Sequence, residues 1–205
     1  VTFVVAVVAC NVPVVIVTAL SPTLAHAQTQ PPAVEWEKTF GGEAGAEGTS
    51  VQQTKDGGYI ITGATESFGS GGNDAYLGKS DASGDLVWQK TYGGTNDDGG
   101  YSVQQTKDDG YIITGATESF GAGGNDAYLV KTDAMGNMIW QKTHGGTAND
   151  EGRSVQQTKD DGYIIAGVTR SFGAGESDIY LVKTDASGNK DWENTFGGAS
   201  NEFGL

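Results

Sequence analysis

The sequence predicts an all-β protein, and more closely a β-propeller built from four-stranded blades. The first observation is a repeat, because the four tryptophans recur every 52 residues, at Trp36, Trp88, Trp140 and Trp192. The second is that each repeat holds four short strand-like segments separated by turns rich in glycine and aspartate. The third is that no segment shows the 3.6-residue apolar period of an amphipathic helix. Four strands in a repeat of about 40–50 residues are typical of a propeller blade.

Each strand of the first complete repeat has its own signal. The expected strands are residues 50–54, 59–65, 75–80 and 86–92. Asp56-Gly57 separates the first two, and Asp-Gly between apolar runs indicates a hairpin. The β-branched Ile60 and Ile61 favour extended backbone in the second strand. A glycine-rich loop precedes the third strand. A turn headed by Asp81 precedes the fourth, because Asp caps a turn and the glycine after it supplies a positive φ.

The near-identity of the repeats sets the expected domain boundaries. Residues 50–92 and 102–144 are identical at 34 of 43 positions. The expected segments are a signal peptide at 1–27, a linker at 28–33, a last blade strand with its link loop at 34–49, and repeats at 50–101, 102–153 and 154–205, the third including the start of a further repeat. Residues 34–40 match the fourth strand of a blade. The prediction is therefore one strand followed by three sets of four, or thirteen strands.

This strand count predicts an incomplete ring. Propellers typically close with four to eight blades, whereas this chain supplies three complete blades and one extra strand. A lone fourth strand before the first blade is what a ring closed by strands from both chain ends would contain. We therefore expect the three matching strands to lie beyond Leu205, and the alternative is that two or more chains assemble into one ring. The alternative fold is a β-solenoid, although its rungs usually run to about 20–30 residues.

The repeat also resembles a known class of proteins. The segments that carry the resemblance are Trp-Gln-Lys-Thr-Tyr-Gly-Gly at 88–94, Ser-Val-Gln-Gln-Thr at 102–106 and Asp-Gly-Tyr-Ile-Ile-Thr-Gly-Ala-Thr at 109–117. They look like the repeat of secreted bacterial and archaeal β-propeller-repeat proteins. The match covers roughly residues 34–205. It implies a scaffold at or outside the cell surface and no particular chemistry.

The N-terminal segment predicts export. Residues 1–20 are almost entirely apolar and are followed by Pro22 and by the triplet Ala25-His26-Ala27. A small-x-small triplet after an apolar run is typical of a signal-peptidase site, so we expect cleavage after Ala27 and a secreted, extracellular or cell-surface protein. The alternative is an uncleaved membrane anchor, since about twenty apolar residues can span a bilayer. Any other attachment to a membrane would require an anchor outside this sequence.

Charge and cysteine content exclude several classes of function. The chain carries 26 acidic and 12 basic residues, a net charge of −14. This charge argues against a nucleic-acid partner, which requires clustered Lys and Arg. The single cysteine excludes a disulfide framework and a cysteine-based zinc site. The partners we expect are an extracellular glycan or protein, and a second copy of the chain if the sequence is not a fragment.

The long loop of each repeat carries an aromatic candidate for ligand binding. These residues are Phe68, Phe120 and Phe172. Exposed aromatic rings on loops can stack on sugar rings, so they are the candidate groups for a carbohydrate. The alternative is that the rings fill space between blades, where large side chains bury much apolar area.

The same loop ends in an aspartate that is a candidate metal ligand. Its sequence in the first repeat, residues 69–77, resembles a glycine-rich calcium-binding nonapeptide. The candidate ligands are Asp74, Asp126 and Asp178. Calcium is the one candidate cofactor. It takes six to eight oxygen ligands, and the local sequence offers fewer oxygen ligands than that. The alternative is that each aspartate only marks the start of a strand.

No catalytic residue is assigned. The chain contains no Gly-x-Ser-x-Gly, His-Glu-x-x-His or P-loop motif. His144, which replaces an aromatic residue of the other repeats, has no nucleophile or carboxylate at a recognisable spacing. We therefore expect a non-catalytic module that acts as a binding or adhesion scaffold. The alternatives are a carbohydrate-binding propeller and a fragment of a larger extracellular hydrolase or lyase.

Overall fold

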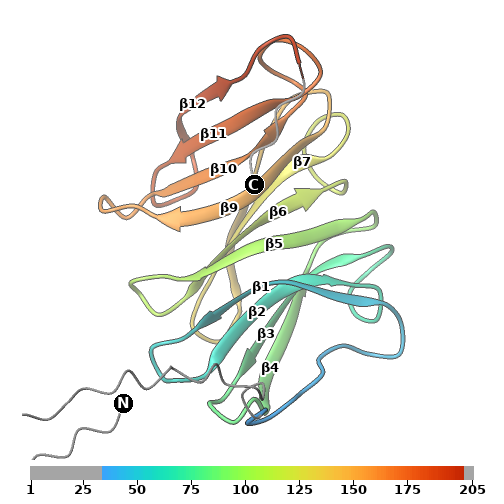
Figure 1. Cartoon of the computed structure of the whole chain (residues 1–205), viewed down its shortest axis with the longest axis vertical. Helices are drawn as coiled ribbons and strands as arrows, with labels where there is room; N and C mark the ends of the chain where they lie inside the picture. Colours follow the sequence, from blue (N-terminus) through green and yellow to red (C-terminus); the bar gives the residue numbers. More distant parts are fainter. Residues whose placement is uncertain (1–33, 201–205) are drawn as a thin grey trace, which may run out of the picture. The chain divides into compact units, whose positions relative to one another are not determined.

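The protein is all-β, with three four-stranded antiparallel sheets and no helix in the part of the chain described by the computed structural model, residues 34–200 (Figure 1). Sheet 1 contains β1 (Ala46–Gln53), β2 (Tyr59–Thr65), β3 (Asp74–Ser80) and β4 (Leu86–Tyr92). Sheet 2 contains β5 (Asp98–Gln105), β6 (Tyr111–Thr117), β7 (Asp126–Thr132) and β8 (Met138–His144). Sheet 3 contains β9 (Asp150–Gln157), β10 (Tyr163–Thr169), β11 (Asp178–Thr184) and β12 (Lys190–Phe196). In every sheet the strands lie side by side in sequence order.

The first strand of each sheet is longer than the sequence predicts. The expected start of the first strand at residue 50 is wrong, because β1 begins at Ala46. Ala46 pairs with Thr65, and Gly48 pairs with Gly63 before the register shifts by one residue at Thr49. The same β-bulge occurs in β5 and β9. The third strand likewise begins one residue early, at Asp74. The early residues are glycine and acidic residues, which strand propensity disfavours, so pairing with β2 overrides propensity.

The expectation of an extra strand at residues 34–40 is also wrong. These residues form no strand, so the described chain contains twelve strands and not thirteen. Trp36 nevertheless packs edge-on against Tyr59, with ring centroids 5.6 Å apart. Trp88 packs in the same way on Tyr111, at 5.8 Å. The segment therefore lies against sheet 1 where the fourth strand of a preceding sheet would pack, but within residues 34–200 no third strand lies beside it to supply hydrogen bonds.

Several predicted segments lie outside the described residues. They are the signal peptide with its cleavage site after Ala27, the linker at 28–33 and the end of the third repeat at 201–205. Within residues 34–200 there is no helix of the length and hydrophobicity needed to cross a membrane.

A buried lysine ties the first hairpin of each sheet to the third strand. Lys131 Nζ lies 3.0 Å from Asp108 Oδ2 in the hairpin between β5 and β6 and donates a 2.7 Å hydrogen bond to the Thr132 carbonyl. Lys79 makes the equivalent bonds with Asp56 and Ser80. Burying an ammonium group is costly unless it is paired and hydrogen-bonded, and here it is both. The hairpin aspartate that the sequence assigns to a turn therefore also neutralises a buried cation.

Two opposite faces of each sheet build the core. We call the face of a sheet that packs on the following sheet its outgoing face, and in sheet 1 this face carries Ile60, Leu77 and Trp88. The opposite face, which packs on the preceding sheet, is the incoming face, and in sheet 2 it carries Val103, Tyr111 and Ile113. The outgoing face of sheet 1 packs on the incoming face of sheet 2 in one apolar cluster. The outgoing face of sheet 2, with Ile112, Leu129 and Trp140, packs in the same way on the incoming face of sheet 3, with Val155, Tyr163 and Ile165. Burial on both faces explains the consecutive apolar residues of the second strands.

A glycine lies under the tryptophan at each junction. Gly136 has φ +75°, and a Cβ built on it would lie 2.7 Å from the Trp88 ring. Gly188 lies under Trp140 with the same geometry, at φ +76°. Glycine is needed at these turns both for the backbone conformation and for the ring that covers it.

Replacing the covered glycine tests this packing. We expect Gly136→Ala to destabilise the fold by roughly 2–4 kcal/mol, since it combines an unfavourable φ with overpacking. The matched control is Gly57→Ala, because Gly57 has φ +85° and nothing within 4 Å of its Cβ position. The control should lose only the backbone part, about 1–2 kcal/mol. Urea unfolding monitored by tryptophan fluorescence measures both, and equal losses would contradict close packing of Trp88 on the turn.

Candidate functional site

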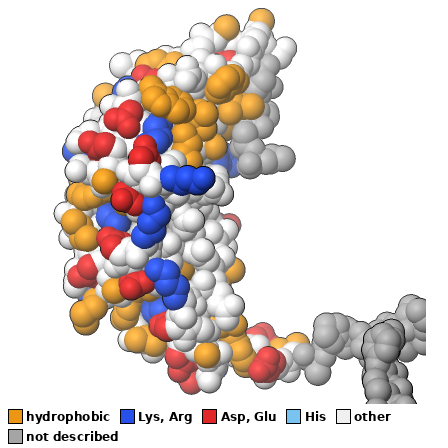
Figure 2. Space-filling view, turned by 90° about the vertical axis from the view of Figure 1, so that its left-hand side faces the viewer, with side chains coloured by type: hydrophobic (Ala, Val, Ile, Leu, Met, Phe, Trp, Pro, Cys, Tyr) orange, Lys and Arg blue, Asp and Glu red, His pale blue; other side chains and the backbone are white. Residues whose placement is uncertain are grey.

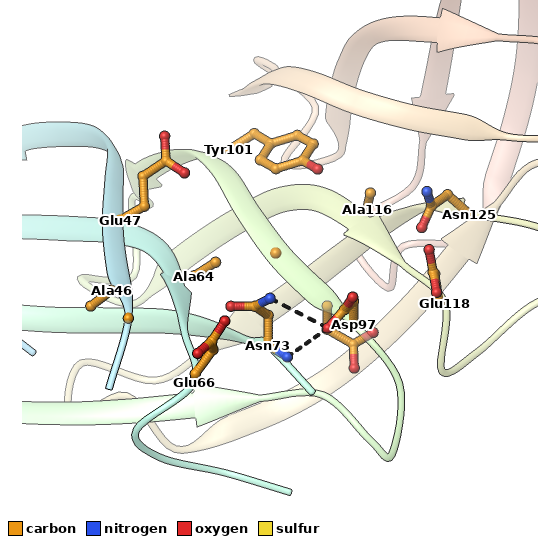
Figure 3. Close-up of a pocket in the computed structure, with 13 residues that line it drawn as sticks. Ala46, Glu47, Ala64, Glu66, Asn73, Asp97, Tyr101, Ala116, Glu118 and Asn125 are labelled. Atoms are coloured by element: carbon orange, nitrogen blue, oxygen red, sulfur yellow. Dashed lines mark hydrogen bonds between the residues drawn. The ribbon is translucent and has the colours of Figure 1, made fainter. Parts of the chain in front are cut away.

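A polar pocket of about 580 Å³ opens where sheets 1 and 2 meet, and we call it the junction pocket (Figure 3). It is formed by the first residues of β1 and β5 and by the loops that follow β2 and β6. The lining residues with polar side chains are Glu47, Glu66, Asn73, Asp97, Asp98, Tyr101, Glu118 and Asn125. Glycine and alanine, which leave the space open, form the rest of its wall.

Backbone hydrogen bonds hold the loops of this pocket in place. The Glu66 amide donates to the Gly45 carbonyl and the Glu118 amide donates to the Asp97 carbonyl, both at 2.9 Å. The loop after β2 is also bound to the start of sheet 2. Asp97 Oδ1 accepts hydrogen bonds from the backbone amide of Asn73 at 2.7 Å and from its side-chain amide at 3.3 Å (Figure 3). The acidic side chains therefore project from a fixed frame.

The junction pocket is strongly acidic. Glu47, Glu66, Asp97 and Glu118 line it, and no lysine or arginine is among its lining residues. Such a group of carboxylates favours the approach of a positively charged group, because the surrounding walls focus their field, and the Arg153 guanidinium already lies over the Tyr101 ring, 5.8 Å from its centroid. Asn73, Asn125 and Tyr101 add neutral hydrogen-bonding groups beside the carboxylates.

Tyr101 is a lining residue whose position carries a different side chain in each repeat. It lies at the β-bulge of β5, and the bulge positions of β1 and β9 carry Thr49 and Arg153. Bulges re-aim a side chain, and they are common beside binding sites. Thr49 Oγ1 turns into the fold and donates to the Gly100 carbonyl at 2.5 Å, whereas the Tyr101 ring lies at the pocket (Figure 3). Burial raises the pKa of the Tyr101 hydroxyl, with Glu151 adding to the shift, so it remains a neutral donor.

Two further cavities are products of the repeat itself. One, of about 550 Å³, is lined by Lys55, Trp88 and Tyr111 among others. The other, of about 530 Å³, is lined by the equivalent Lys107, Trp140 and Tyr163. Because both junctions build this cavity from the same residues, it follows from the packing of the sheets. The junction pocket instead contains a residue that the repeat does not conserve.

Sequence reasoning did not single out Tyr101, Glu47, Glu66 or Glu118. The available signal was the divergence of the segment before each Ser-Val-Gln-Gln run, which ends in Thr49, Tyr101 and Arg153. The bulge that makes this position project is a property of strand pairing and is not visible in the spacing of residues.

The predicted metal ligands lie apart from one another, one at the start of each third strand. Asp74, Asp126 and Asp178 are buried, and their Oδ2 atoms accept backbone hydrogen bonds from Ser70, Ala122 and Ala174 at 2.7, 2.8 and 2.9 Å. These bonds close the glycine-rich loop onto its strand. Burial raises the pKa of the Asp74 and Asp126 carboxyls.

A second carboxylate approaches the first two of these aspartates. A Cβ on Gly93 would lie 2.2 Å from Asp74 Oδ1 and 2.6 Å from Asp98 Oδ2, so the two carboxylates converge above this glycine. Asp126 and Asp150 converge in the same way above Gly145. Within residues 34–200, no group of three or more His, Cys, Asp or Glu side chains is arranged to hold a metal ion. Two carboxylates supply fewer oxygens than the six to eight that calcium takes.

The predicted aromatic residues pack along the third strands and do not line the junction pocket. Phe120 packs against Tyr128, with ring centroids 5.9 Å apart, and joins the core between sheets 1 and 2. Phe172 packs on Tyr180 at 5.8 Å and keeps 37% of its surface exposed. Phe68 is half-buried near Gly42. Their contacts are those expected of residues that cover the ends of the sheets.

His144 lies in the core at the end of β8 and not in a pocket. Its side chain is 9% exposed, and its Nε2 atom has no hydrogen-bond partner. Burial is the main cause that lowers the pKa of His144 to about 4, and the nearby charges of Lys190 and Lys142 lower it further. The charge of Glu193 and a hydrogen bond with the Gly188 backbone act in the opposite direction. The equivalent Tyr92 donates a 2.6 Å hydrogen bond to the carbonyl of Gly136, which is the counterpart of Gly188.

This histidine makes the stability of the fold depend on pH. The folded state holds His144 neutral, whereas the unfolded chain protonates it below its ordinary pKa of 6.5. The contribution of neutral His144 to the free energy of unfolding is therefore complete above pH 6.5. It is lost as the pH falls toward 4, and the total loss is roughly 2–3 kcal/mol. His144→Tyr, which installs the residue of the preceding repeat, should remove this loss. The measurement is the free energy of unfolding of the wild type and of His144→Tyr, each at pH 7 and at pH 4.5. If the difference between the two proteins were the same at both pH values, the buried neutral imidazole would be contradicted.

Comparisons with known proteins give a structural likeness and no family. No family model and no curated protein matches the chain. Among solved structures, it is similar to a protein of unknown function from Bacteroides caccae, at 11% identity and a TM-score of 0.49. The match covers 75% of this chain and 47% of the other, so the present chain spans less than half the length of that protein.

Proposed function

We propose that the protein is a non-catalytic binding module, secreted or displayed at the cell surface, with the architecture of a β-propeller repeat. The junction pocket is its ligand site. The observation that carries the proposal is that Tyr101, at a position where the repeats diverge, lies in an acidic pocket whose frame is fixed by hydrogen bonds.

Support for a propeller arrangement comes from how the sheets follow one another. Each sheet holds one 52-residue unit with its strands in sequence order, as a propeller blade does. Each sheet packs face to face on the next through the same residues. The ends of the sheets, where first strands begin and second strands end, then form one rim on which loops carry the variable side chains.

Support for a cationic ligand group comes from the charge of the pocket. Five carboxylates and one tyrosine line it, and the whole chain carries a net charge of −14. An ammonium or guanidinium group could pair with the carboxylates, and the Tyr101 ring attracts cations, as its contact with the Arg153 guanidinium illustrates. Support for export comes from the apolar segment that precedes Ala25-His26-Ala27.

A carbohydrate is the second candidate ligand. Tyr101 provides an aromatic surface, and Asn73, Asn125 and the carboxylates provide acceptors and donors of the kind that bind hydroxyl groups. An amino sugar would satisfy both candidates, because it combines hydroxyl groups with an ammonium group.

Binding to arrays of defined ligands tests the proposal. The probes are neutral glycans, amino-sugar glycans and peptides rich in lysine or arginine. We expect binding to amino-sugar glycans or basic peptides that weakens with added salt. Tyr101→Thr, which installs the residue that sheet 1 carries at its bulge, should weaken this binding by about tenfold or more.

The control for this experiment is Glu37→Gln, which removes one exposed carboxylate outside the pocket and should leave binding unchanged. Binding to neutral glycans alone would select the carbohydrate candidate over the cationic one. No binding to any probe at millimolar concentration would overturn the proposed function, and so would equal affinity of the wild type and Tyr101→Thr.

A further inference from the structure

The contact between sheets is built twice from one set of residues. Trp88 meets Tyr111 with ring centroids 5.8 Å apart and an interplanar angle of 61°, and Trp140 meets Tyr163 at 5.7 Å and 65°. Polar bonds repeat as well. Gln52 Oε1 accepts a 2.7 Å hydrogen bond from the Gln105 amide, and Gln104 Oε1 accepts a 2.6 Å bond from the Gln157 amide. The outgoing face of sheet 3 keeps Ile164, Leu181 and Trp192 of this set, so it offers the same apolar surface to an incoming face.

One incoming face has no sheet packed on it among the described residues. On sheet 1, Val51 is 64% exposed, whereas the equivalent Val103 and Val155 are 6% and 4% exposed. Val51 lines an open cavity of about 440 Å³ together with Tyr59, Ile61 and Trp36. These residues differ from their buried equivalents only in lacking a neighbouring sheet.

One outgoing face is open in the same way. On sheet 3, Trp192 is 43% and Phe196 is 54% exposed. The equivalents of Phe196 are the buried Tyr92 and His144. Figure 2 shows hydrophobic side chains gathered at the upper end of the molecule, where sheet 3 lies. Exposed apolar surface of this kind marks a site of association.

We propose that the chain binds a second copy of itself head to tail, with the outgoing face of sheet 3 packed on the incoming face of sheet 1 of the next copy. The proposal does not depend on the ligand pocket. Ile164, Leu181 and Trp192 would take the places that Ile60, Leu77 and Trp88 hold at the first junction. Val51, Tyr59 and Ile61 would receive them as Val103, Tyr111 and Ile113 do. Such a heterologous contact either closes a ring or extends a chain of copies.

Residues 36–40 cover part of the incoming face of sheet 1, so a second copy must displace them when it binds. Trp36 covers Tyr59 at 5.6 Å, and Lys38 pairs with the exposed Asp85 at 2.8 Å. The segment has no strand pairing. Trp192 of the second copy would replace the Trp36 contact with an equivalent one, and Ile164 and Leu181 would add burial that Trp36 does not provide. The exchange therefore favours the second copy.

One charge pair of the internal junctions would be missing from this contact. Lys55 Nζ lies 2.6 Å from Asp109 Oδ1, and Lys107 Nζ lies 2.6 Å from Asp161 Oδ1. Figure 2 shows basic and acidic side chains side by side along this part of the surface. Lys159 of sheet 3 would face Gly57 of the next copy, where the other repeats have aspartate. Gly57 has φ +85°, and Asp109 and Asp161 adopt φ 63° and 64°, so an aspartate fits this position.

Analytical ultracentrifugation of the purified chain over micromolar to submillimolar concentrations tests the proposal. We expect concentration-dependent association of the wild type. Val51→Lys should weaken it about tenfold or more by placing a charge in the contact. The control is Val87→Lys, because Val87 and its equivalent Ile139 are 60% and 58% exposed whether or not a sheet is adjacent. Gly57→Asp should tighten association about threefold, as an exposed ion pair does.

A mixing experiment separates head-to-tail contact from other association. Val51→Lys blocks the incoming face of sheet 1, and Phe196→Lys blocks the outgoing face of sheet 3, so each variant alone should be monomeric. An equimolar mixture retains one intact face of each kind and should form a dimer and nothing larger. Circular dichroism checks that both variants are folded. A monomeric wild type, association that Val51→Lys does not weaken, or a mixture that remains monomeric would overturn the proposal.

Discussion

The packing of a tryptophan from one sheet on a tyrosine of the next is the contact on which the remaining architecture depends. Hydrogen bonds between strands hold each sheet together, but they do not join the three sheets to one another. A backbone hydrogen bond joins each pair of neighbouring sheets, as from the Asp98 amide to the Asn73 carbonyl at 2.7 Å, and side chains supply the remaining contacts, of which the tryptophan is the largest. Its ring needs a glycine beneath it, as at Gly136, and this requirement explains why the turn between third and fourth strands keeps its length and its glycine in every repeat. The polar bonds of Gln52 and Gln104 then set the alignment of neighbouring sheets.

The repeat made most of the fold predictable from the sequence, and its limits lie where pairing overrides local preference. The second and fourth strands of the first repeat begin and end where β-branched residues and Asp-Gly turns indicate. The first strand was predicted too short because Gly48 and Glu47 are poor strand formers that pair only through a bulge. Residues 34–40 have the sequence of a strand, yet a strand requires a neighbour, and the neighbouring strand is not among the described residues.

The candidate site was only partly predictable for a related reason. The link residue Asp97 was recognisable as acidic, whereas Glu66 and Glu118 belong to loops far away in the sequence that the sheet junction brings together. Nothing local in the sequence indicates that Tyr101 projects, because the bulge arises from the register with β6. The aspartates and phenylalanines of the long loop were singled out by their chemistry. The structure gives them bonds and ring contacts that hold that loop to its strand.

The identity of the sheet junctions also bears on how such a gene can change. Because each sheet meets only its neighbours through one standard contact, gain or loss of a whole 52-residue unit requires no new interface. Recombination between near-identical coding segments produces changes of this kind, so the number of units can vary faster than their sequence. A bulge residue such as Tyr101 faces no such restriction, and each added unit brings a fresh position at which binding specificity can diverge.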